Sequence, residues 1–200
     1  MNKLKLLLGS LIFLVSLVMY QPISAQATMT SNSVNWYGID FTKAKLIGSI
    51  GFTDPEDVKD RYFDQWNNLI RNEEEKYNIK KFFKKSTVNY KLDAVKSRNE
   101  AVNHNTLVIE DDHSISEADV RSVASAYKDG SNELGLVLVV ESFNKLENKG
   151  YIWVTFFNTS TGEVIKTKRL KGKSGGFGLR NYWAKAILTI MKDSEKEFKL

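Results

Sequence analysis

An uninterrupted apolar run at residues 134–140 is the strongest constraint on the fold. Its sequence, LGLVLVV, leaves no polar position that could face water. A half-buried strand alternates apolar and polar residues, whereas an inner strand of a sheet that is covered on both faces does not. Helices are the usual cover for both faces of such a sheet. The run therefore predicts an α/β fold in which this segment is an inner strand.

Three segments have the signals of helices that could supply this cover. Asp54 and Pro55 form a typical helix start. Ser116 with Asp119 has the spacing of a capping box. The third segment begins near Leu179, and its apolar residues recur at helical spacing as far as Met191.

Seven segments have the composition or the alternation of strands. They cover residues 34–41, 45–50, 87–95, 106–110, 134–140, 151–157 and 163–170. The predicted fold is therefore a mixed β-sheet with three main helices packed on it. It forms a single α/β domain at residues 34–200, after a flexible lead-in at 28–33.

Residues 1–27 have the pattern of a secretory signal peptide. Lys3 and Lys5 precede an apolar run, and cleavage is expected after Ala25 or after Ala27. The run is shorter than the about 20 residues that a membrane-spanning helix needs, although an uncleaved anchor is the alternative. The pattern predicts a periplasmic or secreted protein with no transmembrane segment after cleavage.

The composition excludes several classes of chemistry. The chain has no cysteine, which rules out disulfides, thiolate metal sites, a cysteine nucleophile and a lipid anchor on an N-terminal cysteine. Its two histidines are too few for a three-histidine zinc site. The formal net charge of +5 falls to +3 without Lys3 and Lys5 of the expected signal peptide, a mild excess that does not by itself indicate nucleic-acid binding. No cofactor and no metal are expected.

A basic segment at residues 164–185 is the main candidate for a binding surface, because it contains no acidic residue. Such a segment can form a basic face, or it can be an edge strand whose lysines prevent pairing with another sheet. Next to it, a glycine turn precedes the last helix, whose free N–H groups would attract anions. Arg180 in the first turn of that helix needs an acidic partner, a bound anion or solvent, and Asn181 is expected to help cap the helix. The predicted binding residues are Lys166, Lys168, Arg169, Lys171, Lys173, Gly175, Gly176, Gly178, Arg180 and Asn181.

The order of elements resembles that of a small α/β domain found in three groups of envelope proteins. They are the penicillin-binding-protein activator lipoproteins, the curli secretion-channel lipoproteins and the TolB N-terminal domain. Residues 151–172, YIWVTFFNTSTGEVIKTKRLKG, are similar to the paired strands of that group, with Asn158 where the group usually has Asp. Residues 171–187 resemble an uncharacterised family of small secreted bacterial envelope proteins. The resemblance implies a non-catalytic envelope role in binding a protein or a polymer, without the lipid anchor of the lipoproteins.

Other features leave alternatives open. The cluster EDDH, from Glu110 to His113, could belong to a hydrolytic enzyme, but it lacks the glycine of a calcium loop and the fixed separation of two catalytic carboxylates. Tyr182 and Trp183 could form a carbohydrate platform, although their spacing places them on the buried stripe of the last helix. A structural subunit would instead expose a large apolar patch. The sequence favours a non-catalytic binding protein whose partner is an envelope protein or an anionic envelope polymer.

Overall fold

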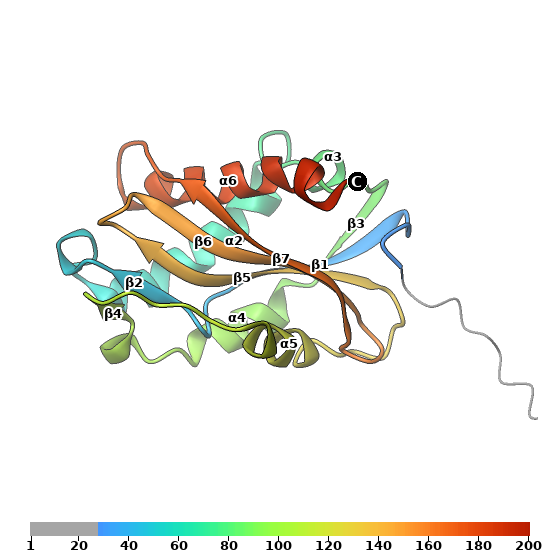
Figure 1. Cartoon of the computed structure of the whole chain (residues 1–200), viewed down its shortest axis with the longest axis horizontal. Helices are drawn as coiled ribbons and strands as arrows, with labels where there is room; N and C mark the ends of the chain where they lie inside the picture. The colour runs from blue at the N-terminus through green and yellow to red at the C-terminus, as the bar shows by residue number, and fades with distance from the viewer. Residues whose placement is uncertain (1–27) are drawn as a thin grey trace, which may run out of the picture.

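A seven-stranded mixed sheet forms the middle layer of the structure, a computed structural model that describes residues 28–200. The expected signal peptide, residues 1–27, lies outside the described residues. Helices cover the sheet on both faces, with α2, α3 and α6 on one side and α4 and α5 on the other (Figure 1). This arrangement confirms the mixed α/β architecture.

The apolar run is the centre of the sheet, as its sequence predicts. It forms most of β5 (Leu134–Asn144), in which every residue is buried. β5 pairs in parallel with β1 and β2 and antiparallel with β6, while β7 pairs only with β6 and ends the sheet. The other strands are β1 (Ser33–Asp40), β2 (Lys45–Ile47), β3 (Thr87–Tyr90), β4 (Val108–Ile109), β6 (Lys149–Asn158) and β7 (Val164–Lys173).

The helices begin where the sequence places their caps. Asp54 accepts a hydrogen bond from the Asp57 N–H at 2.9 Å and begins one continuous helix, made of α1, a π-helical turn (η2) and α2. The helical elements are α1 (Pro55–Asp57), η2 (Val58–Tyr62), α2 (Phe63–Asn72), α3 (Ile79–Phe82), α4 (Leu92–Glu100), α5 (Glu117–Ser125) and α6 (Leu179–Phe198), with 3-10 turns η1 (Ser49–Gly51) and η3 (His104–Thr106). Within residues 28–200, no helix is both long and apolar enough to cross a bilayer.

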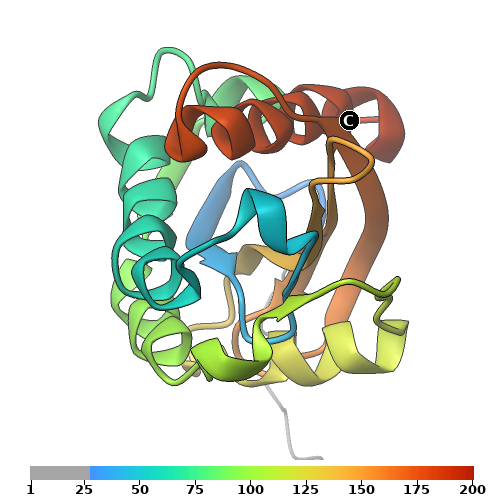
Figure 2. The same ribbon diagram turned by 90° about the vertical axis from the view of Figure 1, so that its left-hand side faces the viewer.

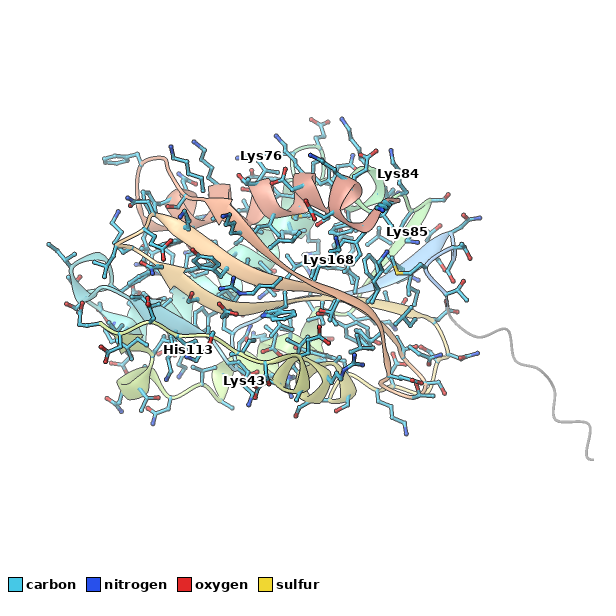
Figure 3. The ribbon with its side chains drawn as sticks, in the orientation of Figure 1. Lys43, Lys76, Lys84, Lys85, His113 and Lys168 are labelled. Carbon is cyan, nitrogen blue, oxygen red and sulfur yellow. The ribbon has the colours of Figure 1, made fainter. Side chains whose placement is uncertain are left out.

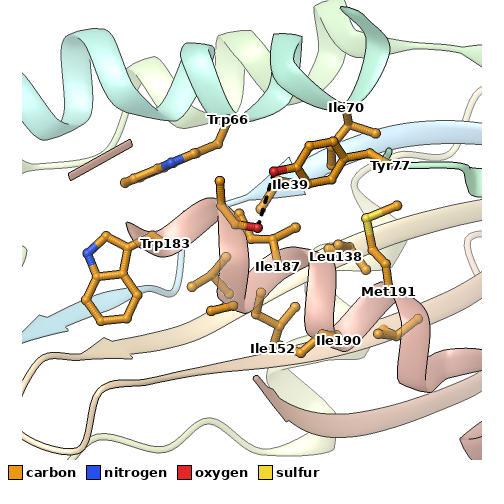
Figure 4. Close-up of a cluster of buried hydrophobic side chains, with 14 of the residues drawn as sticks. Ile39, Trp66, Ile70, Tyr77, Leu138, Ile152, Trp183, Ile187, Ile190 and Met191 are labelled. Carbon is orange, nitrogen blue, oxygen red and sulfur yellow. Dashed lines mark hydrogen bonds between the residues drawn. The ribbon is translucent and has the colours of Figure 1, made fainter. Parts of the chain in front are cut away.

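Two hydrophobic cores lie on opposite sides of the sheet. The larger core packs α2, α3 and α6 on the sheet, and Figure 4 shows Trp66 and Trp183 within it. The smaller core packs α4 and α5 on the other face. Trp36 and Tyr37 are neighbours on β1, and each is buried in a different core. Adjacent residues of a strand point to opposite faces of the sheet, and both rings are buried because helices cover both faces.

Residues 87–95 differ from the predicted long strand. β3 ends at Tyr90, and α4 begins at Leu92 and adds a fourth long helix to the three predicted. Leu92 and Val95 are three residues apart, which also fits one face of a helix, and α4 buries Val95. Asn99 then accepts from the Phe41 N–H at 2.8 Å and donates to the Ile39 carbonyl at 2.9 Å. α4 is thus held against β1 by long-range hydrogen bonds that no local pattern predicts.

The predicted capping box of α5 is present. The Ser116 hydroxyl accepts from the Asp119 N–H at 3.2 Å, and the Asp119 carboxylate accepts from the Ser116 N–H at 3.0 Å. Hydrogen bonds from Ser116, together with Lys43 at 3.2 Å, lower the pKa of Asp119 to about 2. The charged carboxylate therefore stabilises the start of α5.

An Asp119→Asn variant should lose this stabilisation at neutral pH. A pKa that is lower in the folded state than its unfolded value of about 3.9 means stability that is complete above about pH 4 and is lost as the pH falls toward 2. The difference in unfolding free energy between wild type and variant should therefore be constant from pH 5 to 7 and shrink steadily as the pH falls from 4 toward 2. Chemical denaturation at several pH values would measure it, and a difference as large at pH 2 as at pH 7 would contradict this account.

Candidate functional site

The cations of β7 are divided between the two faces of the sheet, because successive side chains of a strand point to opposite sides. Lys166 and Lys168 lie on the face that α6 covers. The Lys166 ammonium donates to the Phe198 carbonyl at 2.9 Å, and Lys168 forms an ion pair with Glu197 at 3.3 Å. Figure 3 shows Lys168 below α6. These two lysines therefore bind acceptor groups at the C-terminal end of α6, where positive charge stabilises a helix.

Arg169 lies on the opposite face and holds a buried acid. Its guanidinium donates to both carboxylate oxygens of Glu141, at 2.5 and 2.9 Å, and Glu141 is 0% exposed. The Trp153 indole N–H donates to the same carboxylate at 3.1 Å, and the Tyr151 ring lies 4.5 Å from the guanidinium carbon. The hydrogen bonds from Arg169 to Glu141 raise the pKa of the guanidinium further. The positive charge of Arg169 is thus paired with the buried carboxylate of Glu141, and this pair has a structural role.

Lys171 and Lys173 are the remaining cations of β7. Both are exposed and lie at the end of the strand that leads into the glycine turn. Within the described residues, the ion pairs of β7 are those of Lys168 and Arg169. The charges of Lys171 and Lys173 therefore face solvent.

The glycine turn, residues 174–178, has a backbone that only glycine adopts easily. Gly175, Gly176 and Gly178 have φ angles of 155°, 112° and 77°. The Ser174 N–H donates to the Asn148 carbonyl at 3.0 Å, and the Gly175 N–H donates to the Tyr182 carbonyl at 3.0 Å. The turn is thus held at its base.

The first turn of α6 provides Arg180 with an acidic partner, one of the three alternatives that the sequence leaves open. The Arg180 guanidinium lies 3.3 Å from the Glu73 carboxylate, and the Arg180 carbonyl accepts from the Trp66 indole N–H at 2.9 Å. Gly178 is the N-cap and provides no side-chain cap. The Asn181 amide instead donates to the Phe177 carbonyl at 3.2 Å, so it fastens the glycine turn and does not cap the helix.

Three turns that are distant in sequence meet at one end of the molecule, which we call the loop end. They are η1, the β5–β6 turn at residues 145–148, and the glycine turn. A Cβ added at Gly48 would lie 3.2 Å from the Leu146 side chain, which places η1 against the β5–β6 turn. The Lys145 ammonium lies 3.8 Å from the centre of the Tyr182 ring, and the Tyr182 hydroxyl bonds to Asn148. Figure 2 looks directly at this end.

Each turn of the loop end exposes one large apolar side chain. Phe177 is 95% exposed, Ile50 is 85% exposed and Leu146 is 62% exposed, and these are the large apolar residues that residues 28–200 leave in solvent. The sequence identifies the glycine turn but not Ile50 or Leu146, because each is a single apolar residue in a polar turn. Only the position of Phe177 among three glycines is a signal that the sequence offers.

The EDDH cluster borders an open cavity of about 280 Å³, which Glu147 of the β5–β6 turn also lines. His113 and Asp112 line it together with Arg169. His113 donates from Nε2 to the Lys43 carbonyl at 3.0 Å, and Figure 3 shows these two residues together. Glu110 instead accepts from the Ser49 N–H at 2.8 Å. Among residues 28–200, no three His, Asp or Glu side chains lie close enough to hold a metal ion.

Comparison with known proteins shows a weak likeness of fold. No family model matches the chain, and no curated protein matches it. Among solved structures, the chain is similar to the LpoB C-terminal domain from Salmonella enterica, with 12% sequence identity and a TM-score of 0.33. The match covers 78% of this chain and 90% of that one.

Proposed function

We propose that the protein is a non-catalytic binding protein of the cell envelope that docks through its loop end. The observation that carries the proposal is the glycine turn, where Phe177 is 95% exposed beside lysines whose charges face solvent. Exposed apolar side chains within a charged surface are typical of interaction sites. The signal peptide expected at residues 1–27 supports a location in the envelope.

The charges of the loop end favour an anionic partner. Lys171 and Lys173 lead into the glycine turn, and a Cβ added at Gly175 would lie 3.3 Å from the Lys185 ammonium, so Lys185 lies against the same turn. Glu147 is the acid of the β5–β6 turn, and its carboxylate accepts from Lys149 at 2.9 Å and from the Tyr151 hydroxyl at 2.7 Å. Glu147 also interacts electrostatically with Lys171, so the positive charge left beside the glycine turn is that of Lys173 and Lys185.

A Lys171→Gln/Lys173→Gln variant should bind an anionic matrix more weakly than wild type. Each lysine near an anionic surface contributes on the order of 1 kcal/mol, so the salt concentration needed for elution should fall clearly. The matched control is Lys166→Gln/Lys168→Gln, which removes the same charge from the same strand where α6 already engages it. Elution in a salt gradient measures both variants.

The control should elute close to wild type, with both variants checked for an unchanged melting temperature. An equal shift for the two variants would mean that retention follows net charge alone. That result would remove the basis for a docking surface at the loop end.

A further inference from the structure

We infer that the loop end inserts its three apolar tips into the surface of an anionic lipid bilayer. The inference rests on the proposed function and names the partner for it. The three tips are Ile50 in η1, Leu146 in the β5–β6 turn and Phe177 in the glycine turn, and each is exposed.

The separation of the tips favours a bilayer over a folded partner. A protein partner usually meets a packed apolar centre with a polar rim. Here each apolar side chain belongs to a different turn, and more than half of each residue is exposed to solvent. Such tips can enter the boundary between lipid headgroups and acyl chains one by one, because that boundary adapts to their shape.

The lysines of the loop end lie where lipid phosphates would be. Lys145 of the β5–β6 turn lies over the Tyr182 ring of α6. Lys173 and Lys185 lie beside the glycine turn. Long lysine side chains extend their ammonium groups to the headgroup level while apolar neighbours go deeper. Two acids at this end have partners within the chain: Glu147 accepts from Lys149 and from the Tyr151 hydroxyl, and Glu110 accepts from the Ser49 N–H. Their hydrogen bonds lower the pKa of both carboxyls.

The two ends of the described chain do not cover the loop end. The C-terminus and the start of β1 both lie toward the opposite end of the molecule (Figure 1). The turn between β6 and β7, residues 159–163, lies there too. This opposite end therefore provides a control position on the same molecule.

Labelling of single cysteines can test the inference, because the chain has no cysteine of its own. An environment-sensitive fluorophore is attached in a Phe177→Cys variant and, as control, in a Thr161→Cys variant in the β6–β7 turn. With vesicles of phosphatidylglycerol and phosphatidylcholine, the emission at 177 should shift to the blue, and the emission at 161 should not change. Pure phosphatidylcholine vesicles should give a much smaller shift at 177.

Vesicle co-sedimentation of unlabelled Phe177→Ser should show binding about tenfold weaker than wild type, because one large apolar side chain no longer leaves water. A blue shift at 161 and none at 177, or equal pelleting of Phe177→Ser and wild type, would overturn the inference by placing the contact elsewhere. Vesicle binding that is absent, while Lys171→Gln/Lys173→Gln still changes elution from the anionic matrix, would overturn the bilayer inference alone. The proposed function would then stand with an anionic polymer or protein as partner.

Discussion

Replacing Trp183 by alanine should lower the free energy of unfolding by about 3–5 kcal/mol. The Trp183 side chain is completely buried in the larger core. Its ring stacks on Phe143 at 4.6 Å between centroids and on Phe52 at 5.4 Å. The substitution would leave a cavity among α6, β5 and the segment after η1, and these rigid elements cannot close it. Urea denaturation would measure the loss.

Tyr182 provides the matched control, since it is the adjacent aromatic residue of α6 and is only half-buried. A Tyr182→Ala variant should lose clearly less stability than Trp183→Ala. If Trp183→Ala left stability unchanged and abolished binding of a carbohydrate, the ring would belong to a ligand platform. The buried position of Trp183 argues for the core.

Replacing Arg98 by methionine should lower the free energy of unfolding by about 3 kcal/mol. Its partner Asp40 is 0% exposed and lies 2.9 Å from the Arg98 Nε. The Asp40 carboxylate also accepts from the Tyr127 hydroxyl at 2.6 Å and from the Thr42 N–H at 2.8 Å. Burial, and then the negative charge of Asp40, raise the pKa of Tyr127, so its hydroxyl keeps its proton and continues to donate. Without Arg98, the buried carboxylate loses its opposite charge.

Arg121→Met is the control for this prediction. Arg121 pairs with Glu117 at 3.5 Å, and both side chains are exposed, so the loss should stay within about 0.5 kcal/mol. A double-mutant cycle with Asp40→Asn should show coupling between Arg98 and Asp40. Equal losses for Arg98→Met and Arg121→Met would mean that the buried pair is not held as the structure shows.

The fold could be predicted where neighbouring residues along the chain decide the structure. The inner strand β5, the capping box of α5 and the long stripe of α6 all depend on residues a few positions apart. Residues 87–95 show the limit of such patterns, because the change from strand to helix at Leu92 depends on Asn99 bonding to the backbone of β1. That contact joins residues about 60 positions apart, and hydrophobic spacing carries no information about it.

The candidate site was predicted only in part, for the same reason. The charges of β7 are visible in the sequence, and so is the need of Arg180 for an acidic partner, a bound anion or solvent. Which acid meets which cation is not visible: Arg169 meets Glu141 through the pairing of β5, β6 and β7, and Arg180 meets Glu73 through the packing of α2 on α6. Lys171 and Lys173 are left facing solvent by these pairings.

The sequence by itself determined an inner strand without polar positions, helices with their caps, a glycine turn and a supply of positive charge. These follow from side-chain volume, polarity and backbone freedom, which act over a few residues. The tertiary structure alone decided which charges are neutralised and which turns meet at the loop end. The physical reason is that strand pairing and helix packing bring Ile50, Leu146 and Phe177 to one end from turns about 30 to 130 residues apart, through contacts that no single segment contains.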